Sequence, residues 1–274
     1  MFLYPKTPKT SFVIRTYNEQ RWIGRVLEVL FSQSRLDFEV IIVDSSSIDN
    51  TSRIIKTFPI RKKITIPKKT FHYSYALNLG IKEAWGEYIG ILSGHSVPVD
   101  KNWYSNGLSH FYHKSVVAVT GYCTSLPDGT IQEKLRDLNE GAEIQKIVHY
   151  TPWMTNTNAL IRKSLWCEYP FDERITAAED YDWASEMVAR GWDVIKDPLF
   201  NVFHSHGGLK RKTYVDLLSK HNHSISLIDK KPRPGHSFST IINAPKQISI
   251  NYPKYIINKS YSIFKRFVPI VNKR

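Results

Sequence analysis

The first hundred residues alternate between two kinds of segment, and this alternation constrains the fold more than any other feature of the chain. Short apolar, β-branched runs predict strands, whereas apolar residues at helical spacing, such as Trp22, Val26 and Val29, predict helices. Strands and helices in regular alternation indicate an α/β fold with a doubly wound, mostly parallel sheet flanked by helices. The predicted strands are residues 11–15, 38–43, 63–66 and 87–92, and the predicted helices are residues 18–32, 49–55 and 75–84.

The second half of the chain continues the pattern less regularly. It predicts strands at residues 116–120 and 193–195, an ordered segment at 156–162, and helices near 132–147 and 179–189. Residues 230–235 predict a loop or hinge. The two cysteines, Cys123 and Cys167, lack the spacing of a zinc site or a disulfide framework, which fits a reducing compartment.

The net charge of +13 is concentrated near the C-terminus. Residues 207–274 contain 14 Lys and Arg residues but only two acidic residues, whereas the first 206 residues are close to neutral. A basic segment favours polyanionic partners such as nucleic acid, anionic lipid or phosphate-bearing molecules. No nucleic-acid-reading motif is recognisable, so we expect no nucleic acid partner.

The last part of this basic segment has a second feature. Residues 252–271 mix apolar and aromatic residues with Lys and Arg, which is typical of a segment that lies on an anionic membrane surface. Packing on the chain's own domain or on a second copy is an equally good interpretation. The chain has no signal-type N-terminus and no apolar run near the roughly 20 residues that span a bilayer. We therefore expect a cytoplasmic protein, either free or peripheral on the inner face of the membrane.

Several polar residues follow predicted strands, where ligands of doubly wound sheets bind. Asp44 ends the second strand, and its carboxylate suits a base N–H or a ribose hydroxyl, although it is also a turn-capping residue. His95 follows the fourth strand. His204 and His206 fall on the same face of an extended segment, which suits either two metal or phosphate contacts or a structural histidine pair.

Four stretches, taken in order, resemble the family 2 glycosyltransferases, which have the GT-A fold. They are residues 13–19 (VIRTYNE), 42–51 (IVDSSSIDNT), 78–80 with 86–89 (NLG and GEYI) and 178–180 (AED), and the resemblance covers about residues 10–206. Residues 71–73 (FHY) and 204–206 (HSH) look most like rhamnosyltransferases of O-antigen and capsule assembly.

The resemblance implies an inverting transfer of one sugar from a nucleotide-sugar donor, either dTDP- or UDP-linked, to a glycan or lipid-linked glycan of a surface polysaccharide. Asp180 would be the general base, supported by Glu179, although acidic residues at helix starts also serve as caps. The implied nucleotide-binding residues are Arg15, Thr16, Tyr17, Glu19, Asp44, Ser45, Asn78, Ser93 and His95. Aromatic and amide side chains suit sugar rings, and the predicted acceptor-binding residues are Trp153, Asn156, Asn158 and Asp182.

The chain departs from the family at the Asp-x-Asp positions that usually hold a divalent cation, because Ser93 and His95 stand there. Imidazole suits Mn²⁺ better than Mg²⁺. Two interpretations stay open: a divalent cation (Mn²⁺ or Mg²⁺) bound by His95 with His204 and His206, or no metal, with cationic groups neutralising the leaving diphosphate.

The expected organisation is a GT-A catalytic domain over residues 1–206, with a nucleotide-binding half at about 1–100 and an acceptor half at about 101–206. A basic, mainly helical extension would follow over residues 207–274. The altered Asp-x-Asp positions also leave open a non-catalytic nucleotide- or glycan-binding scaffold with a degenerate site. A nucleotidyltransferase is disfavoured because the N-terminal part lacks a Gly-rich phosphate loop.

Overall fold

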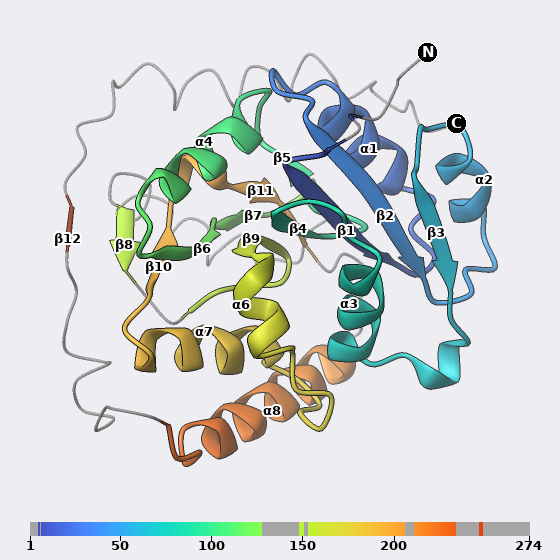
Figure 1. Ribbon diagram of the computed structural model, residues 1–274. Coiled ribbons are helices and arrows are strands. Elements are labelled where there is room, and N and C mark those ends of the chain that lie inside the picture. Colours follow the sequence, from blue (N-terminus) through green and yellow to red (C-terminus); the bar gives the residue numbers. More distant parts are fainter. Residues whose placement is uncertain are drawn as a thin grey trace.

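The computed structural model describes residues 5, 7–127, 148–150, 153–205, 211–233 and 247–248. Its main sheet has nine strands in the order β12-β8-β10-β6-β9-β4-β1-β2-β3, and a small second sheet has the order β5-β11-β7. Figure 1 shows the helices arranged around this central sheet.

The strands are β1 Thr10–Thr16, β2 Phe38–Asp44, β3 Lys62–Thr65, β4 Tyr88–Ser93, β5 Val97–Pro98, β6 Val116–Thr120, β7 Cys123–Thr124, β8 Val148–Tyr150, β9 Asn158–Arg162, β10 Asp193–Lys196, β11 Val202–Phe203 and β12 Gln247–Ile248. The α-helices are α1 Ile23–Phe31, α2 Thr51–Ile55, α3 Tyr73–Lys82, α4 Trp103–Ser109, α6 Lys163–Glu168, α7 Glu179–Ala189 and α8 Arg211–Ile228. Short 3₁₀ turns lie at η1 Lys68–Thr70, η2 His110–Tyr112 and η3 Pro198–Phe200.

The sheet confirms the predicted doubly wound, mostly parallel architecture. Strands β3, β2, β1 and β4 are mutually parallel, and β6 is parallel to β10. Strand β9 lies between β4 and β6 and is antiparallel to both. The carboxyl ends of β1, β2 and β4 therefore meet at one edge, and the turns and loops that follow these three strands share that edge.

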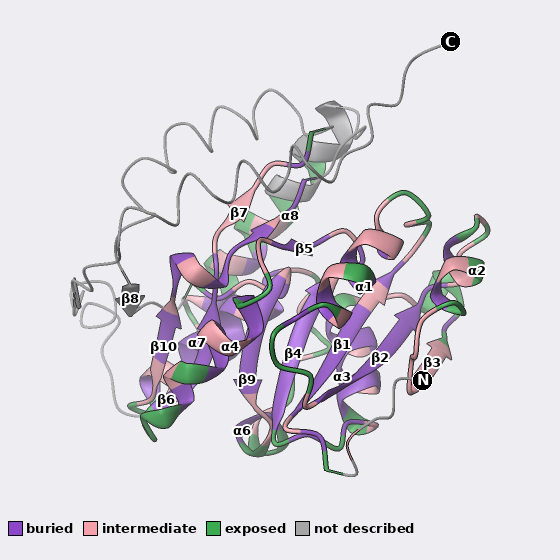
Figure 2. Ribbon diagram, turned by 90° about the horizontal axis from the view of Figure 1, so that it is seen from above, coloured by how far each residue is buried: buried purple, intermediate pink, exposed green. Residues whose placement is uncertain are grey.

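Each face of the sheet has its own core, because successive side chains of a strand point to opposite faces. Phe12 and Ile14 pack with α1 and α4, whereas Val13 packs with α3, α6 and α7. Figure 2 shows the central strands as the most buried part of the molecule and the outer loops as exposed.

The first helix begins later than the sequence predicts. Residues 18–22 form a turn, and α1 starts at Ile23. Asn18 has a left-handed backbone (φ 53°), and its N–H donates to Ser47 Oγ at 2.9 Å. The N–H of Glu19 donates to Thr51 Oγ1 at 2.7 Å. The N–H donors of this turn are thus used by side chains of the loop after β2 and of the first residue of α2, and the prediction of a helix from residue 18 was wrong.

Part of the predicted C-terminal extension is described. Helix α8 lies next to α7 (Figure 1) and covers Ala178 and Tyr181 with Ile225 and Ile228. The predicted helix near 132–147, the predicted site residue His206 and the amphipathic segment 252–271 all lie outside the described residues. Within the described part of the chain, no helix combines the length and the apolar character needed to cross a membrane.

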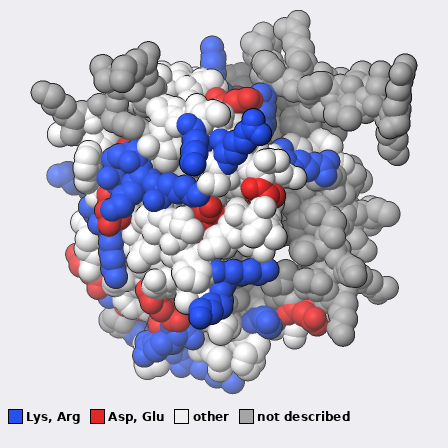
Figure 3. Space-filling view, turned by 90° about the vertical axis from the view of Figure 1, so that its right-hand side faces the viewer, with Lys and Arg blue, Asp and Glu red and all other residues white. Residues whose placement is uncertain are grey.

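The side of the molecule that carries α2 and β3 is basic, although the first 206 residues are nearly neutral in total. Figure 3 shows Lys and Arg side chains gathered there. Lys62 pairs with Glu83 and Lys63 pairs with Asp44. A positive potential beside the end of β2 attracts anionic ligands to that edge of the sheet. The basic residues of these elements and of the adjoining loops are Arg53, Lys56, Arg61, Lys62, Lys63, Lys68 and Lys69.

Candidate active site

The carboxyl ends of three parallel strands bring the predicted nucleotide-binding residues together. Thr16 pairs with Asp44, and Arg15 pairs with Ser93, in the strand register. The loop after β4 also lies close against the turn after β1. A Cβ added at Gly94 would lie 3.0 Å from both Thr16 Oγ1 and Glu19 Cγ. The sequence placed these residues at one edge, and the structure confirms that they share it.

Asp44 organises the loop after β2. Its Oδ1 accepts hydrogen bonds from the N–H and the hydroxyl of Ser47, at 3.0 and 2.6 Å, and its Oδ2 pairs with Lys63 Nζ at 2.8 Å. Only 1% of Asp44 is exposed. The carboxylate therefore fixes the backbone of residues 45–47, which borders the site, and its charge is compensated by a cation from the neighbouring strand.

Two buried hydroxyl groups lie beside Asp44 without a hydrogen-bond partner among the described residues. They belong to Thr16 and Ser45, which are 4% and 2% exposed. Tyr17 directly follows Thr16 in sequence, and the Lys68 ammonium lies 4.5 Å from the centre of the Tyr17 ring. Unpaired buried hydroxyls are rare in folded proteins and are a feature of ligand sites.

Two of the three histidines predicted to bind metal or phosphate, His95 and His204, lie together; the third, His206, lies outside the described residues. The rings of His95 and His204 are stacked, with centroids 4.4 Å apart. His95 Nδ1 lies 2.7 Å from Glu19 Oε1 and 3.5 Å from Ser93 Oγ, and His204 Nδ1 lies 3.1 Å from Ser96 Oγ. Within the described residues, no three His, Cys, Asp or Glu side chains gather in a way that could hold a metal ion.

The predicted catalytic carboxylates occupy the first turn of α7 and are held from outside the helix. The N–H of Asn156 donates to Asp180 Oδ2 at 2.8 Å, and the Asn156 side-chain amide donates to Glu179 Oε1 at 3.0 Å. Arg15 donates to the Asn156 carbonyl oxygen at 3.2 Å, and its guanidinium lies 3.8 Å from Glu179. Arg15 thus connects the carboxyl end of β1 to the carboxylates predicted to be catalytic.

Burial, together with the adjacent Glu179 carboxylate, raises the pKa of Asp180 to about 7. Hydrogen bonds from the backbone N–H groups of Asn156 and Tyr181, and the Arg15 charge, oppose this increase. A carboxylate with a pKa near neutrality is a far better proton acceptor than an ordinary aspartate. Asp180 is therefore suited to take a proton from a hydroxyl group at physiological pH.

The four predicted acceptor-side residues differ in their surroundings. Trp153 is 51% exposed and stacks on Tyr181 at 4.4 Å, so it presents an aromatic surface beside the first turn of α7. Asn156 is bonded to Glu179 and Asp180. Asn158 and Asp182 are fully buried. Asn158 donates to the Phe200 carbonyl oxygen, and Asp182 pairs with Arg233 at 2.7 Å.

Asn78, which was predicted to bind nucleotide, joins α3 to the loop before α7. Its amide donates to the Phe171 carbonyl oxygen and to Glu173 Oε1, both at 2.9 Å, and its oxygen accepts from Trp166 at 3.0 Å. With both amide hydrogens bonded in this way, Asn78 has a positioning role in the structure.

Sequence reasoning missed three charged residues of this region: Lys63, Lys231 and Arg233. Lys63 was noted only as part of a strand, and the other two fell in a predicted hinge. Lys63 contacts Asp44 at 2.8 Å, and Lys231 contacts Asp182 at 3.2 Å. Lys63 is 19 residues from Asp44 in sequence, and Lys231 is 49 residues from Asp182, so no local sequence pattern identifies these pairs.

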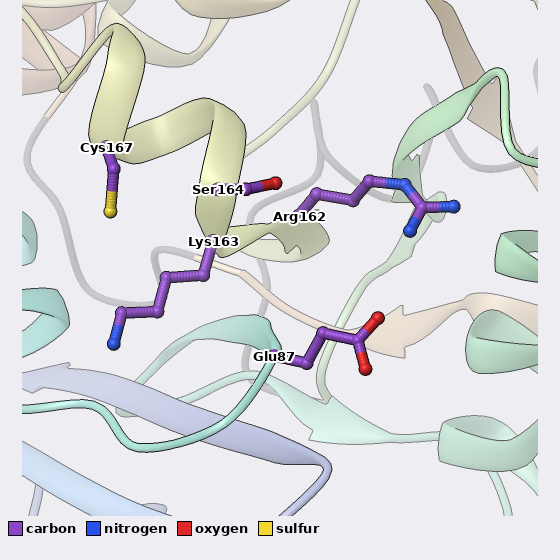
Figure 4. Close-up of a pocket in the computed structure, with 5 residues that line it drawn as sticks. All are labelled: Glu87, Arg162, Lys163, Ser164 and Cys167. Atoms are coloured by element: carbon purple, nitrogen blue, oxygen red, sulfur yellow. The ribbon is translucent and has the colours of Figure 1, made fainter.

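A cavity of about 240 Å³ lies at the opposite edge of the sheet. It is at the start of β4 and the end of β9, next to Glu87 and Arg162 (Figure 4). The side chains of Arg162 and Lys163 extend in different directions there, and both are bonded to backbone carbonyl oxygens, Val116 at 2.8 Å and Ala84 at 2.6 Å. These bonds occupy Arg162 and Lys163, and the cavity lies away from Glu179 and Asp180.

Comparisons with known proteins agree with this geometry. The chain is 26% identical over 220 residues to the O-antigen chain rhamnosyltransferase WbaN of Salmonella anatum, covering 76% of this chain and 69% of WbaN. It is 24% identical over 232 residues, or 73% of this chain and 68% of the relative, to the dolichyl N-acetyl-alpha-D-glucosaminyl phosphate 3-beta-D-2,3-diacetamido-2,3-dideoxy-beta-D-glucuronosyltransferase of Methanococcus voltae.

A solved structure shows the same fold. The mannosyltransferase PcManGT from Pyrobaculum calidifontis, in complex with GDP-Man and Mn²⁺, matches with a TM-score of 0.67 at 20% identity, over 86% of this chain and 68% of that chain. The expected GT-A fold is thereby confirmed. The model of the family described as glycosyl transferase family 2 matches residues 11–168, which is more than half of the chain. This chain therefore belongs to glycosyl transferase family 2.

Proposed function

We propose that this glycosyltransferase is an inverting enzyme that moves a sugar from a nucleotide-sugar donor to a glycan or lipid-linked glycan during surface polysaccharide assembly. One observation carries the proposal. Asp180, with a pKa raised to about 7, is held by Asn156 on the same side of the molecule as the ends of β1 and β4, to which Arg15 connects it.

In the proposed reaction, Asp180 takes the proton of the acceptor hydroxyl. The hydroxyl oxygen forms a bond to the anomeric carbon from the face opposite the donor's diphosphate. The bond between the anomeric carbon and the diphosphate oxygen breaks, and the nucleoside diphosphate leaves with the electron pair. Attack from the opposite face inverts the anomeric configuration. Glu179 supports the base by holding the Asn156 amide, at 3.0 Å.

We assign donor binding to the edge formed by β1, β2 and β4. Asp44 and the buried hydroxyls of Thr16 and Ser45 would contact the nucleoside, and Tyr17 and Glu19 border the same turn. The basic side of the molecule next to Asp44 would attract the negatively charged diphosphate. The stacked rings of His95 and His204 would face the diphosphate as it departs.

The described groups fit a divalent cation only in part. His95, His204 and Glu19 offer nitrogen and oxygen ligands, but they do not form a three-ligand site within the described residues. A cation bound there would need the donor's phosphate oxygens, and it would neutralise charge on the leaving diphosphate. No step above depends on it.

The resemblance to O-antigen rhamnosyltransferases favours a dTDP-linked 6-deoxy sugar, with UDP-sugars as the second choice. Trp153 and Asn156 would border the acceptor sugar, since aromatic faces and amides suit sugar rings. Asn158 and Asp182 are buried, so they would shape the acceptor region from behind its surface and not by contact with the sugar. We further propose that the enzyme works in the cytoplasm, at the inner face of the membrane when its acceptor is lipid-linked.

Thermal stabilisation by nucleotides tests this function. The purified chain is heated with dTDP, UDP or GDP, each in the presence of Mn²⁺, Mg²⁺ or a chelator. A ligand at 100 times its Kd adds about 2.7 kcal/mol to stability, which is a visible shift in Tm. We expect stabilisation by one nucleotide, and the chelator series decides whether binding uses a cation. No shift with any nucleotide would contradict the proposed donor site.

A matched pair of variants locates the binding site. Asp44→Asn changes the carboxylate at the end of β2, whereas Asp37→Asn changes a carboxylate just before the same strand, at the other edge of the sheet. We expect the nucleotide shift to be lost only in Asp44→Asn. A nucleotide-induced shift in Tm of equal size in both variants would show that the nucleotide does not bind at the end of β2.

A further inference from the structure

Arg233 lies beyond the end of α8 and bonds two acidic residues of α7. Its guanidinium donates to Asp182 Oδ1 at 2.7 Å, to the Asp182 carbonyl oxygen at 3.1 Å and to Glu186 Oε2 at 3.0 Å. The Arg233 side chain is 3% exposed, and those of Asp182 and Glu186 are 1% and 8% exposed. Lys231 adds a contact to Asp182 at 3.2 Å. The segment after α8 is therefore fastened to α7 by a buried ionic cluster.

The same part of the chain also covers the start of α7. Ile225 and Ile228 of α8 pack against Ala178 and Tyr181. The Tyr181 hydroxyl donates to Asp229 Oδ1 at 3.0 Å. Ionic contacts at Asp182 and Glu186 and apolar contacts at Ala178 and Tyr181 give two attachments between residues 225–233 and this part of the chain.

The residue just before α7 has an unfavourable backbone conformation. Ala178 has φ 64° and ψ 32°, in the left-handed region, and only 3% of it is exposed. A residue with a Cβ atom adopts this conformation only where its surroundings hold it. Ala178 directly precedes Glu179 and Asp180, so its conformation sets the direction in which both carboxylates leave the loop.

The bond between Asp180 and Asn156 depends on where α7 lies. It joins the first turn of α7 to the loop before β9, and its length is 2.8 Å. Asp182, which Arg233 holds, is only two residues further along the helix. A displacement of about 1 Å at a reacting group can cost a hundredfold in rate. Contacts that fix α7 therefore also fix the catalytic carboxylate.

We propose that Arg233 is a positioning residue, which holds α7 through Asp182 and Glu186 so that Asp180 stays aligned with Asn156. Residues 225–233 thereby belong to the catalytic apparatus, although they lie beyond the segment that the family model matches. This proposal rests on the proposed function, because it takes Asp180 as the base.

The test compares three variants of the full chain. Arg233→Lys keeps the positive charge but loses the planar guanidinium that reaches both carboxylates. Arg233→Ala removes the charge and the guanidinium together. Arg190→Ala is the matched control, since Arg190 also contacts Glu186, at 2.9 Å, but has no contact with Asp182 among the described residues. The first measurement is the titration midpoint of Asp180. NMR on protein labelled with ¹³C-aspartate monitors this titration, and the Asp180→Asn variant identifies which signal belongs to Asp180. The second is the release of nucleoside diphosphate from the donor that stabilises the enzyme.

We expect the Asp180 midpoint to rise by roughly half a pH unit or more in Arg233→Ala, because the bond from Asn156 that favours the charged form is weakened and Asp182 keeps Lys231 but loses the closer of its two cations. The kcat for donor turnover should fall about tenfold or more, with the donor KM within twofold of wild type. Arg233→Lys should lie between wild type and Arg233→Ala, and Arg190→Ala should match wild type in both measurements.

A wild-type Asp180 midpoint and kcat in both Arg233 variants, with only Tm lowered, would overturn the proposal and leave Arg233 a purely stabilising residue. If Arg233→Ala does not fold, Arg233→Lys decides the question by the same criteria. The NMR titration needs no donor, so it decides on Arg233 even if no nucleotide binds and the proposed function itself fails.

Discussion

The backbone N–H of Asn156 donates a 2.8 Å hydrogen bond to the carboxylate of Asp180, although the two residues lie in different elements. The same asparagine holds Glu179 through its side chain and Arg15 through its carbonyl oxygen. One residue thus joins β1, through Arg15, to the first turn of α7, where the proposed base Asp180 lies.

The stability of the protein should depend on the ionisation of Asp180. Its folded pKa of about 7 lies above the ordinary value of 3.8, so the folded state binds more protons than the unfolded state between these values. Stability is therefore lost as pH rises from about 4 through 7. In Asp180→Asn this loss is absent, and the Tm of the variant relative to wild type should increase over that range. Thermal melts at pH 5, 6, 7 and 8 measure it, and a pH-independent difference would contradict the raised pKa.

Neighbouring lysines of β3 should differ sharply in their effect on stability. Lys63→Ala leaves the Asp44 carboxylate, 2% exposed, without its cation, and we expect a loss of about 2–3 kcal/mol. Lys62→Ala breaks an exposed pair with Glu83, where both side chains are about 40% exposed, and should cost less than about 1 kcal/mol. Urea denaturation of both variants checks the difference, and equal losses would show that Lys63 does not balance Asp44.

Gly94 should be essential for the fit between the loop of His95 and the turn after β1. In Gly94→Ala the new Cβ would lie 3.0 Å from Thr16 Oγ1 and 3.1 Å from the Arg15 carbonyl oxygen, so the loop has to move. We expect nucleotide affinity to fall about tenfold with little loss of Tm. Gly24→Ala in α1, whose Cβ meets only Ile54 at 3.3 Å, is the control and should bind as wild type. Calorimetric titration with the nucleotide measures the affinity of both variants. Unchanged affinity in Gly94→Ala would argue against this loop as a donor contact.

Trp153 should matter for the acceptor and not for stability. Because it is 51% exposed, Trp153→Ala should lower Tm only slightly while raising the acceptor KM about tenfold. Trp85→Ala is the control. Trp85 is even more exposed, at 62%, and lies between α3 and β4, where the strand enters the sheet at the other edge. Kinetics with an acceptor selected from a glycan panel give the acceptor KM of the two variants. Equal effects of the two substitutions would remove Trp153 from the acceptor site.

The sheet and its ligand edge could be predicted because their signals are local. Buried parallel strands have continuous apolar sequences, and the residue after each strand falls at one edge of the sheet; Asp44 and His95 were located by this reasoning. Asp180 was recognised by its place in a motif at a helix start. These features depend on short stretches of sequence.

The remaining features depend on contacts between distant segments or on unusual backbone conformations. Arg233 lies in a stretch that indicates only a hinge, and its partner Asp182 is 51 residues earlier in the chain. A left-handed alanine at residue 178 has no sequence signal, because glycine and asparagine are the usual residues there. The start of α1 shifted to Ile23 because side chains of a separate loop bind the preceding N–H groups.

Donor hydrolysis with water in place of the acceptor tests most directly whether Asp180 is the base of an inverting transfer. Wild type and Asp180→Asn are incubated with the nucleotide sugar that stabilises the enzyme, and NMR follows nucleoside diphosphate release and the anomer of the first sugar formed. We expect an inverted sugar from wild type and a rate at least about 100-fold lower in Asp180→Asn, with nucleotide stabilisation retained. Hydrolysis by Asp180→Asn at the wild-type rate, or a product that retains the donor's configuration, would contradict the mechanism.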